Sequence, residues 1–234
     1  MKKNILVLVS AALLAGSLLA ADSSPKDEVA NAAKKLGGQT NYTWKTTVVV
    51  PADAQFRPGP TDGKTEKGGF THVKMSFFDN PLQIVLKGTN AAFTDQDGGW
   101  QSLAEAGGGD GPGQFMGMMI RNFQSPVEEA TELAGFAKEL KKDGDVYSGE
   151  LTEDGAKAKL IFRRGGGGTT VANPKGSVKF WVKDGALIKY EFKVKGTVNW
   201  NGNDFENDRT TTVEIKDVGT TKVEVPEDAK KKIS

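Results

Sequence analysis

The apolar positions of the chain follow first a helical period and then a strand period. The helical spacing holds for a short run that consists of Val29, Ala32, Ala33 and Leu36. Ser24-Pro25 supplies a cap and a first-turn proline before this run, and Gly37-Gly38 ends it. From Tyr42 onward the period is two, so we expect one amphipathic helix followed by a strand over residues 41–50.

Alternation of period two recurs and predicts an antiparallel sheet. Further strands are expected over residues 70–78, 82–86, 91–94, 146–151, 177–182, 187–198, 209–218 and 222–225. Turn residues such as Asp184-Gly185 separate them, and residues 52–68, rich in proline, glycine and charge, are expected to form a loop. In 187–198 we expect Leu187 to share the solvent face with four charged residues, and Ile188 to share the buried face with Tyr190.

Helical patterns interrupt the strands in the middle of the chain. Ser125-Pro126, followed by Glu128-Glu129, predicts a helix that continues to Leu140. Shorter helices are expected from Trp100 to Ala106, from Thr152 toward residue 162, where the run Arg163–Gly168 ends it, and over 226–233. The expected fold class is therefore α+β, with a curved antiparallel sheet whose concave face is covered by helices.

The first 21 residues have the composition of a secretory signal peptide. Lys2 and Lys3 precede an apolar run over residues 5–19, and Ala20-Ala21 are small residues suited to cleavage. That run is short for an anchor, and no later stretch is long and apolar enough to span a bilayer. We expect cleavage near residue 21, one domain over residues 22–234, and a location in the periplasm or outside the cell.

Composition narrows the range of functions. The chain has no cysteine, which excludes disulfides, thiol chemistry and a lipid-modified cysteine. Its 31 Lys and Arg residues nearly balance its 30 Asp and Glu residues, so the sequence gives no sign of the basic stripe typical of nucleic-acid-binding proteins. No nucleic-acid partner is expected.

Motifs for catalysis or metal binding are missing as well. The single histidine, His72, lies in a strand pattern with no serine or acid motif beside it. The acids at 201–208 do not have the spacing of a calcium loop, and residues 163–170 do not sit in the strand–loop–helix context of a nucleotide loop. We therefore expect no enzymatic activity, no cofactor and no metal.

The stretch GQFMGMMIRNF, residues 113–123, concentrates soft apolar side chains and holds three of the five methionines. A plain buried helix would explain it, but methionine also suits surfaces that adapt to varied partners. A concave face rich in aromatic residues needs a cover, and we expect this stretch to form part of it. The expected lining is Trp44, Phe77, Phe93, Phe180, Tyr190 and Phe192, and the expected cover is Phe115, Met116, Met119 and Ile120.

The order of elements, with the closing segment TTTVEIKDVGTTKVEVPEDAKK at 210–231, resembles the LolA-like superfamily of periplasmic lipoprotein carriers and related lipid-binding lipoproteins. The resemblance covers residues 26–233. It implies a half-open β-barrel closed by helices, with a hydrophobic cavity that binds the acyl chain of a lipid or an acylated protein and performs no catalysis. The chain departs from the family in its glycine-rich runs and in lacking the cysteine of membrane-anchored members.

Two functions remain open from the sequence. The first is binding of a lipid or lipoprotein acyl chain in the half-barrel cavity. The second is a cell-envelope scaffold or protein-interaction module with a closed core and no small ligand, in which an exposed sheet edge adds a strand from an envelope protein.

Overall fold

The computed structural model describes residues 23–54, 57–77, 80–106, 112–161 and 169–233. The helices within these residues are α1 (Pro25–Gly37), α2 (Leu103–Ala106), α3 (Pro112–Arg121), α4 (Pro126–Phe136), α5 (Glu153–Leu160) and α6 (Glu227–Lys232). The first strands are β1 (Asn41–Val49), β2 (Thr61–Glu66), β3 (Thr71–Phe77), β4 (Asn80–Lys87), β5 (Asn90–Thr94) and β6 (Trp100–Ser102). The later ones are β7 (Lys141–Asp143), β8 (Val146–Glu150), β9 (Thr169–Lys183), β10 (Ala186–Trp200) and β11 (Asn203–Lys216).

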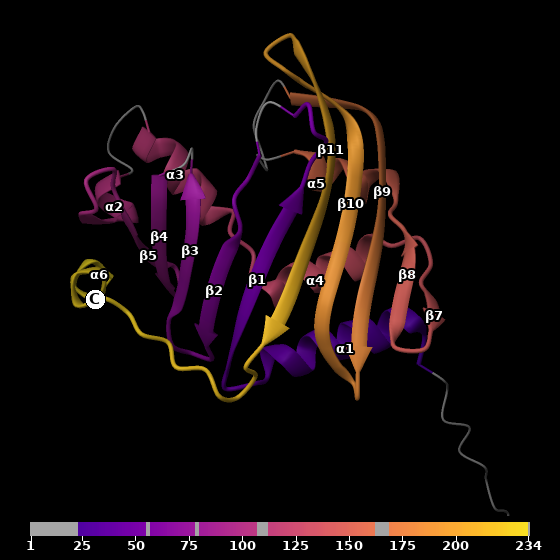
Figure 1. Cartoon of the computed structure of the whole chain (residues 1–234), viewed down its shortest axis with the longest axis horizontal. Helices are drawn as coiled ribbons and strands as arrows, with labels where there is room; N and C mark the ends of the chain where they lie inside the picture. Colours follow the sequence, from indigo (N-terminus) through magenta and orange to yellow (C-terminus); the bar gives the residue numbers. More distant parts are fainter. Residues whose placement is uncertain (1–22, 55–56, 78–79, 107–111, 162–168, 234) are drawn as a thin grey trace, which may run out of the picture.

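The eleven strands of the described residues form one antiparallel sheet in the order β6-β5-β4-β3-β2-β1-β11-β10-β9-β8-β7. Its two ends are β6 and β7, which do not pair with each other, so the sheet stays open. Figure 1 shows this sheet curving around the helices. The predicted fold class, a half-open barrel with helices on the concave face, is confirmed.

Helices divide the concave side between them. α1 packs against α4 and against β9 and β10, while α5 packs against β9 and β10. α2 contacts α3, β5 and β6 at the other end of the sheet (Figure 1). α6 lies on the outer side, where Ala229 and Ile233 cover Val85 and Ala92. The sheet is therefore covered by one helical layer over β8–β11 and a separate pair of helices over the β3–β6 half.

Capping residues set the starts of two helices. The Ser24 hydroxyl accepts from the Asp27 backbone N–H at 3.2 Å, and the Ser125 hydroxyl accepts from the Glu128 N–H at 3.3 Å. Both predicted starts are confirmed, but the predicted extension of α4 to Leu140 is wrong. The helix ends because Ala137 takes an extended conformation and bridges to Leu151, which directs the following chain into β7.

The predicted loop over 52–68 is wrong for its second half, which forms β2. The strand escapes sequence detection because its inward face is small and polar rather than apolar. Gly63 lies opposite Trp44, and a Cβ on Gly63 would stand 2.1 Å from the indole carbons. The Trp44 ring therefore covers β2 and supplies the apolar surface that β2 itself lacks.

A bulge reverses two orientations predicted for β10. The register with β9 shifts between Leu187 and Lys189. Leu187 is consequently buried at 1% exposure, whereas Ile188 is 41% exposed. From Tyr190 onward the predicted alternation is confirmed. The strand predicted at 222–225 is not formed.

Charges of alternating sign cross the outer face of the sheet. Lys189, Glu214, Lys45, Asp62 and Lys74 are successive directly facing residues on β10, β11, β1, β2 and β3. Opposite charges at facing positions favour this pairing, and a slip of one residue would turn each strand's side chains to the wrong face. The ladder therefore helps to fix the register across the middle of the sheet.

Gly63→Ala is expected to lower the free energy of unfolding by about 1–3 kcal/mol, because the added methyl group overlaps the Trp44 ring. Gly135→Ala is the matched control: a Cβ there meets nothing within 4 Å, and alanine in a helix is favoured by up to about 1 kcal/mol. Urea unfolding measures both changes. Equal stability of Gly63→Ala and the parent protein would show that the ring does not rest on Gly63.

Candidate functional site

One contiguous apolar cluster fills the space between the sheet and the helices on its concave side. Six of the predicted lining and cover residues belong to its buried part: Trp44, Phe93, Ile120, Phe180, Tyr190 and Phe192. Met116 and Met119 are partly buried and pack against it. The side chains of Phe77 and Phe115 lie outside the described residues, although β3 and α3 contain their backbones.

Three of these residues, Phe180, Tyr190 and Phe192, lie in the half of the concave face that α4 and α5 cover. Phe180 and Tyr190 face each other from β9 and β10 with ring centroids 6.4 Å apart. The Tyr190 hydroxyl donates to Oε2 of Glu129 on α4 at 2.9 Å. The Phe192 ring lies 5.6 Å from Nζ of Lys159 on α5. This part of the predicted lining is thus held under α4 and α5 by polar contacts at its edge.

A polar network defined by Gln124, Glu129, Glu132 and Lys159 holds that half together. Lys159 is 8% exposed, and its Nζ lies 3.1 Å from Glu129, 2.8 Å from Glu132 and 3.1 Å from Gln124. Arg209 on β11 donates to the backbone carbonyl of Lys159 at the end of α5, where the helix dipole favours a cation. The network therefore ties α4, α5 and the sheet to one another.

The remaining predicted residues lie in the second half of the concave face, around Trp44 and α3. The Trp44 ring centroid is 5.8 Å from that of Tyr42 and 6.4 Å from that of Phe123, which follows α3. Gly117 allows α3 to approach α2 closely, because a Cβ there would stand 3.2 Å from Leu103. The close approach of α3 to α2 at this point is therefore an apolar contact.

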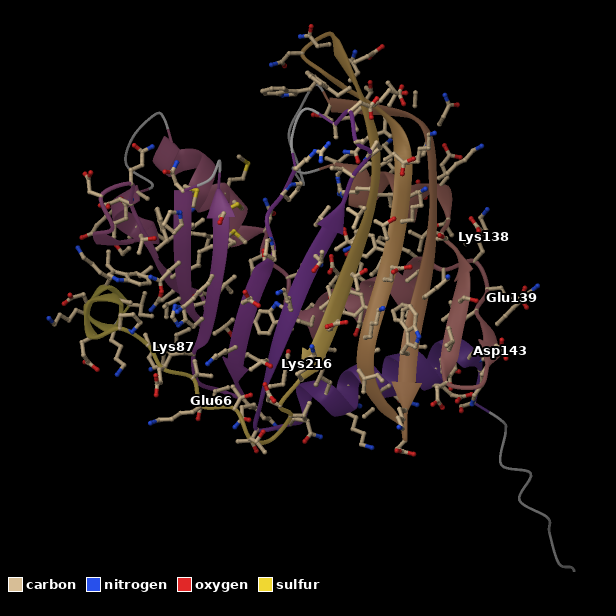
Figure 2. All side chains as sticks on the ribbon, viewed as in Figure 1. Glu66, Lys87, Lys138, Glu139, Asp143 and Lys216 are labelled. Atoms are coloured by element: carbon tan, nitrogen blue, oxygen red, sulfur yellow. The ribbon has the colours of Figure 1, made fainter. Side chains whose placement is uncertain are left out.

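Every methionine after Met1 lies in this second half: Met75 on β3, and Met116, Met118 and Met119 on α3. We call these four residues the methionine cluster, and Figure 2 shows sulfur atoms gathered beside α3. All four side chains are partly buried. Met75 is not among the lining residues predicted from the sequence, although its alternation with the inward-facing Val73 was a usable signal.

The trough itself is filled by protein side chains. Trp44, Phe93 and Phe192 are at most 4% exposed. A hollow of about 430 Å³ on the outer face is lined mainly by charged residues of β1–β3 and β11, and Trp44 is the cluster residue that also lines it. A second hollow of about 460 Å³ lies between α1 and two hairpin turns and is also mainly polar. An acyl chain would therefore enter by displacing side chains rather than by filling a ready-made void.

The single histidine of the chain is held by two contacts within the fold. The Nδ1–H of His72 donates to the carbonyl of Glu224 at 2.9 Å, and Nε2 lies 3.0 Å from Oε1 of Gln83. Among the residues that the structure describes, no group of three or more histidines and acids is placed to hold a metal ion. No helix in the same residues has the length and hydropathy to cross a membrane.

Comparisons with known proteins give similarity of fold. No protein-family model and no curated protein matches the chain. The lipoprotein LppX of Mycobacterium tuberculosis covers 85% of this chain and 97% of its own, with 9% identity and a TM-score of 0.45. LprF of Mycobacterium bovis covers 88% and 100%, with 12% identity and a TM-score of 0.46. A LolA superfamily protein of Nitrosomonas europaea covers 86% and 96%, with 10% identity and a TM-score of 0.37.

The resemblance expected from the sequence is thus found again among solved structures, as a resemblance of fold. At these identities and TM-scores it carries no argument about what the chain binds. The function proposed below rests on the placement of the chain's own residues.

The three tyrosines are expected to ionise late. Burial raises the pKa of Tyr42 to about 12, and the negative charge of Glu128 contributes to this increase. Burial also raises the pKa of Tyr190 and Tyr147. A raised pKa means that the fold favours the neutral phenol. This stabilisation is complete below the unfolded value of about 10 and is lost as the pH rises through the folded values.

Tyrosinate absorbance during an alkaline titration measures this. Native protein should show little tyrosinate at pH 10, and unfolding should accompany ionisation at higher pH, whereas the urea-unfolded chain titrates near pH 10. Native titration near pH 10 would contradict the burial of these phenols.

Lys159→Met is expected to lower the free energy of unfolding by about 3 kcal/mol, because it leaves two carboxylates partly buried without their cation. Lys157→Met, which removes an exposed lysine of the same helix, should change it by less than about 0.5 kcal/mol. Urea midpoints compare the two. Similar midpoints would show that the polar network does not hold α5 in place.

Proposed function

We propose that the protein is an exported carrier that holds the acyl chain of a lipid or lipoprotein between α3 and the inner face of β1–β5. The observation that carries this proposal is the methionine cluster, of which Met75 on β3 and Met116 and Met119 on α3 are partly buried and pack against the apolar core. The polar network anchors the opposite half. The half under α3 is where apolar side chains can exchange one apolar neighbour for another.

The energetics of such an exchange favour binding. Methionine is unbranched and changes rotamer readily, so the contacts of Met116 and Met119 with the apolar core can be replaced by contacts with acyl methylenes. Burial of each methylene contributes about 0.8 kcal/mol, so eight of them contribute about 6 kcal/mol before the cost of displacing side chains. A chain of moderate length therefore supplies enough free energy to open the contact.

The proposal also includes export from the cytoplasm and binding without catalysis. A signal peptide over residues 1–21, removed on export, would leave one domain over 22–234 in the periplasm or outside the cell. Binding without catalysis is proposed because both ring nitrogens of the single histidine already have partners, the Glu224 carbonyl and the Gln83 side chain. The ligand would be a lipid or an acylated protein, and no cofactor is involved.

A second function, an interaction module with a closed core, is favoured by the near-complete burial of Trp44 and Phe93. The two end strands of the sheet are poor sites for strand addition, because β6 and β7 have three residues each. The sequence of β7 is Lys141-Lys142-Asp143, and charged, short edge strands resist pairing with another chain. A partner protein would therefore bind elsewhere than at these two end strands.

The double variant Met116→Asp, Met119→Asp is expected to weaken binding of a fluorescent fatty acid by at least about tenfold. The reason is that carboxylates next to acyl methylenes lose hydration, which costs more than the ~1.4 kcal/mol that corresponds to tenfold. Fluorescence titration of the chain without its leader measures the affinity, and circular dichroism monitors the fold.

Two further variants make this test specific. Met116→Leu with Met119→Leu conserves volume and apolarity, so it should keep the affinity within about tenfold. Ile188→Asp introduces a carboxylate at an exposed apolar position on the outer face and should leave binding unchanged. Unchanged binding by the aspartate double variant would refute the site under α3. A folded parent protein that binds no fatty acid would leave the closed-core module as the better account.

A further inference from the structure

We infer that the outer face of β9 and β10 is a docking surface for a membrane containing anionic lipid. These two neighbouring strands carry six lysines and one acid, Glu191, in a chain whose total charges nearly cancel. We call the six the lysine face: Lys175, Lys179, Lys183, Lys189, Lys193 and Lys195. The positive charge is therefore segregated onto one part of the sheet.

The register places these lysines on a single side. Lys195 faces Lys175 directly, and Lys179 faces Glu191. Nζ of Lys189 lies 4.4 Å from the ring centroid of Trp181, which places both side chains on the same face. The inward neighbours Phe180 and Tyr190 are buried, so the lysine face lies on the outer side.

Within the part of the chain that the structure describes, no helix covers this side of β9 and β10. α1, α4 and α5 lie behind β9 and β10 in Figure 1, on the concave side. All of the lysine face except the partly buried Lys189 is exposed. Asp208 on β11 lies 3.3 Å from Lys193 and 3.9 Å from Lys195, and Glu214 on the same strand faces Lys189. These two acids neutralise only part of the charge. A cationic surface on the outer side of the curved sheet is left open to solvent.

The composition of this surface favours lipid over a nucleic acid. Its cations are all lysines, which act as point charges toward a mobile layer of phosphates, and neither strand contains an arginine for fork-like recognition of bases. Trp181 and the exposed Ile188 lie among the lysines, and such amphipathic or apolar side chains suit the interface between headgroups and acyl chains. Charge complementarity thus points to anionic headgroups.

Flotation with lipid vesicles tests this inference on the chain without its leader. The protein is expected to bind vesicles of phosphatidylcholine with phosphatidylglycerol, to ignore pure phosphatidylcholine, and to detach at high ionic strength. Lys175→Gln, Lys179→Gln and Lys183→Gln together should weaken binding by about two orders of magnitude, since each lysine near an anionic surface contributes about fivefold.

A second triple variant is the matched control. Lys34→Gln, Lys67→Gln and Lys157→Gln remove the same charge from α1, the β2–β3 turn and α5. This control should keep most of the vesicle affinity. Equal weakening by both triples, or no binding of the parent protein to anionic vesicles, would overturn the inference. Tight, salt-dependent binding to heparin in place of vesicles would also overturn it.

The inference stands apart from acyl binding. The β9 triple variant should bind the fluorescent fatty acid in solution as the parent does, because its lysines lie on the opposite side of the sheet from α3. Vesicle docking without fatty-acid binding would support the lysine face and reject the carrier proposal. Fatty-acid binding without vesicle docking would support the carrier proposal and reject the lysine face as a docking surface.

Discussion

Removal of the sheet's inner face from water is the constraint on which the rest of the structure depends. The strands of the described residues form an open, curved sheet with one large apolar face, and an open sheet cannot cover that face itself. At β2 a single side chain provides the cover, because the Trp44 ring lies over this strand where Gly63 leaves room for it. Helices must supply the remaining cover.

The chain meets that requirement in two different ways. Over β9 and β10, α4 and α5 are joined to each other by Lys159 and its partner carboxylates, so that layer is held by directional, charged contacts as well as by apolar ones. Over the other half, α3 rests on the sheet through methionine and other apolar side chains. Directional contacts fix one arrangement, whereas methionine contacts tolerate several. This difference is the physical basis for placing a ligand under α3.

Local patterns predicted much of the fold, and long-range contacts account for what they missed. The serine–proline starts of α1 and α4 and the alternation of β10 beyond Tyr190 are properties of neighbouring residues. β2 was missed because its apolar cover belongs to Trp44, and the Leu187–Ile188 pair was reversed by a bulge. The polar network was not predictable from the sequence, since Lys159 and Glu129 are 30 residues apart. The predicted lining proved to be split between the two halves.

Photocrosslinking with a diazirine-labelled fatty acid, followed by peptide mapping, tests the central claim most directly. The account predicts adducts on α3 (Pro112–Arg121) and on β3 (Thr71–Phe77), and their suppression by an excess of unlabelled fatty acid. Adducts confined to β9 and β10, adducts that unlabelled fatty acid does not suppress, or no adducts at all would contradict an acyl site beneath α3.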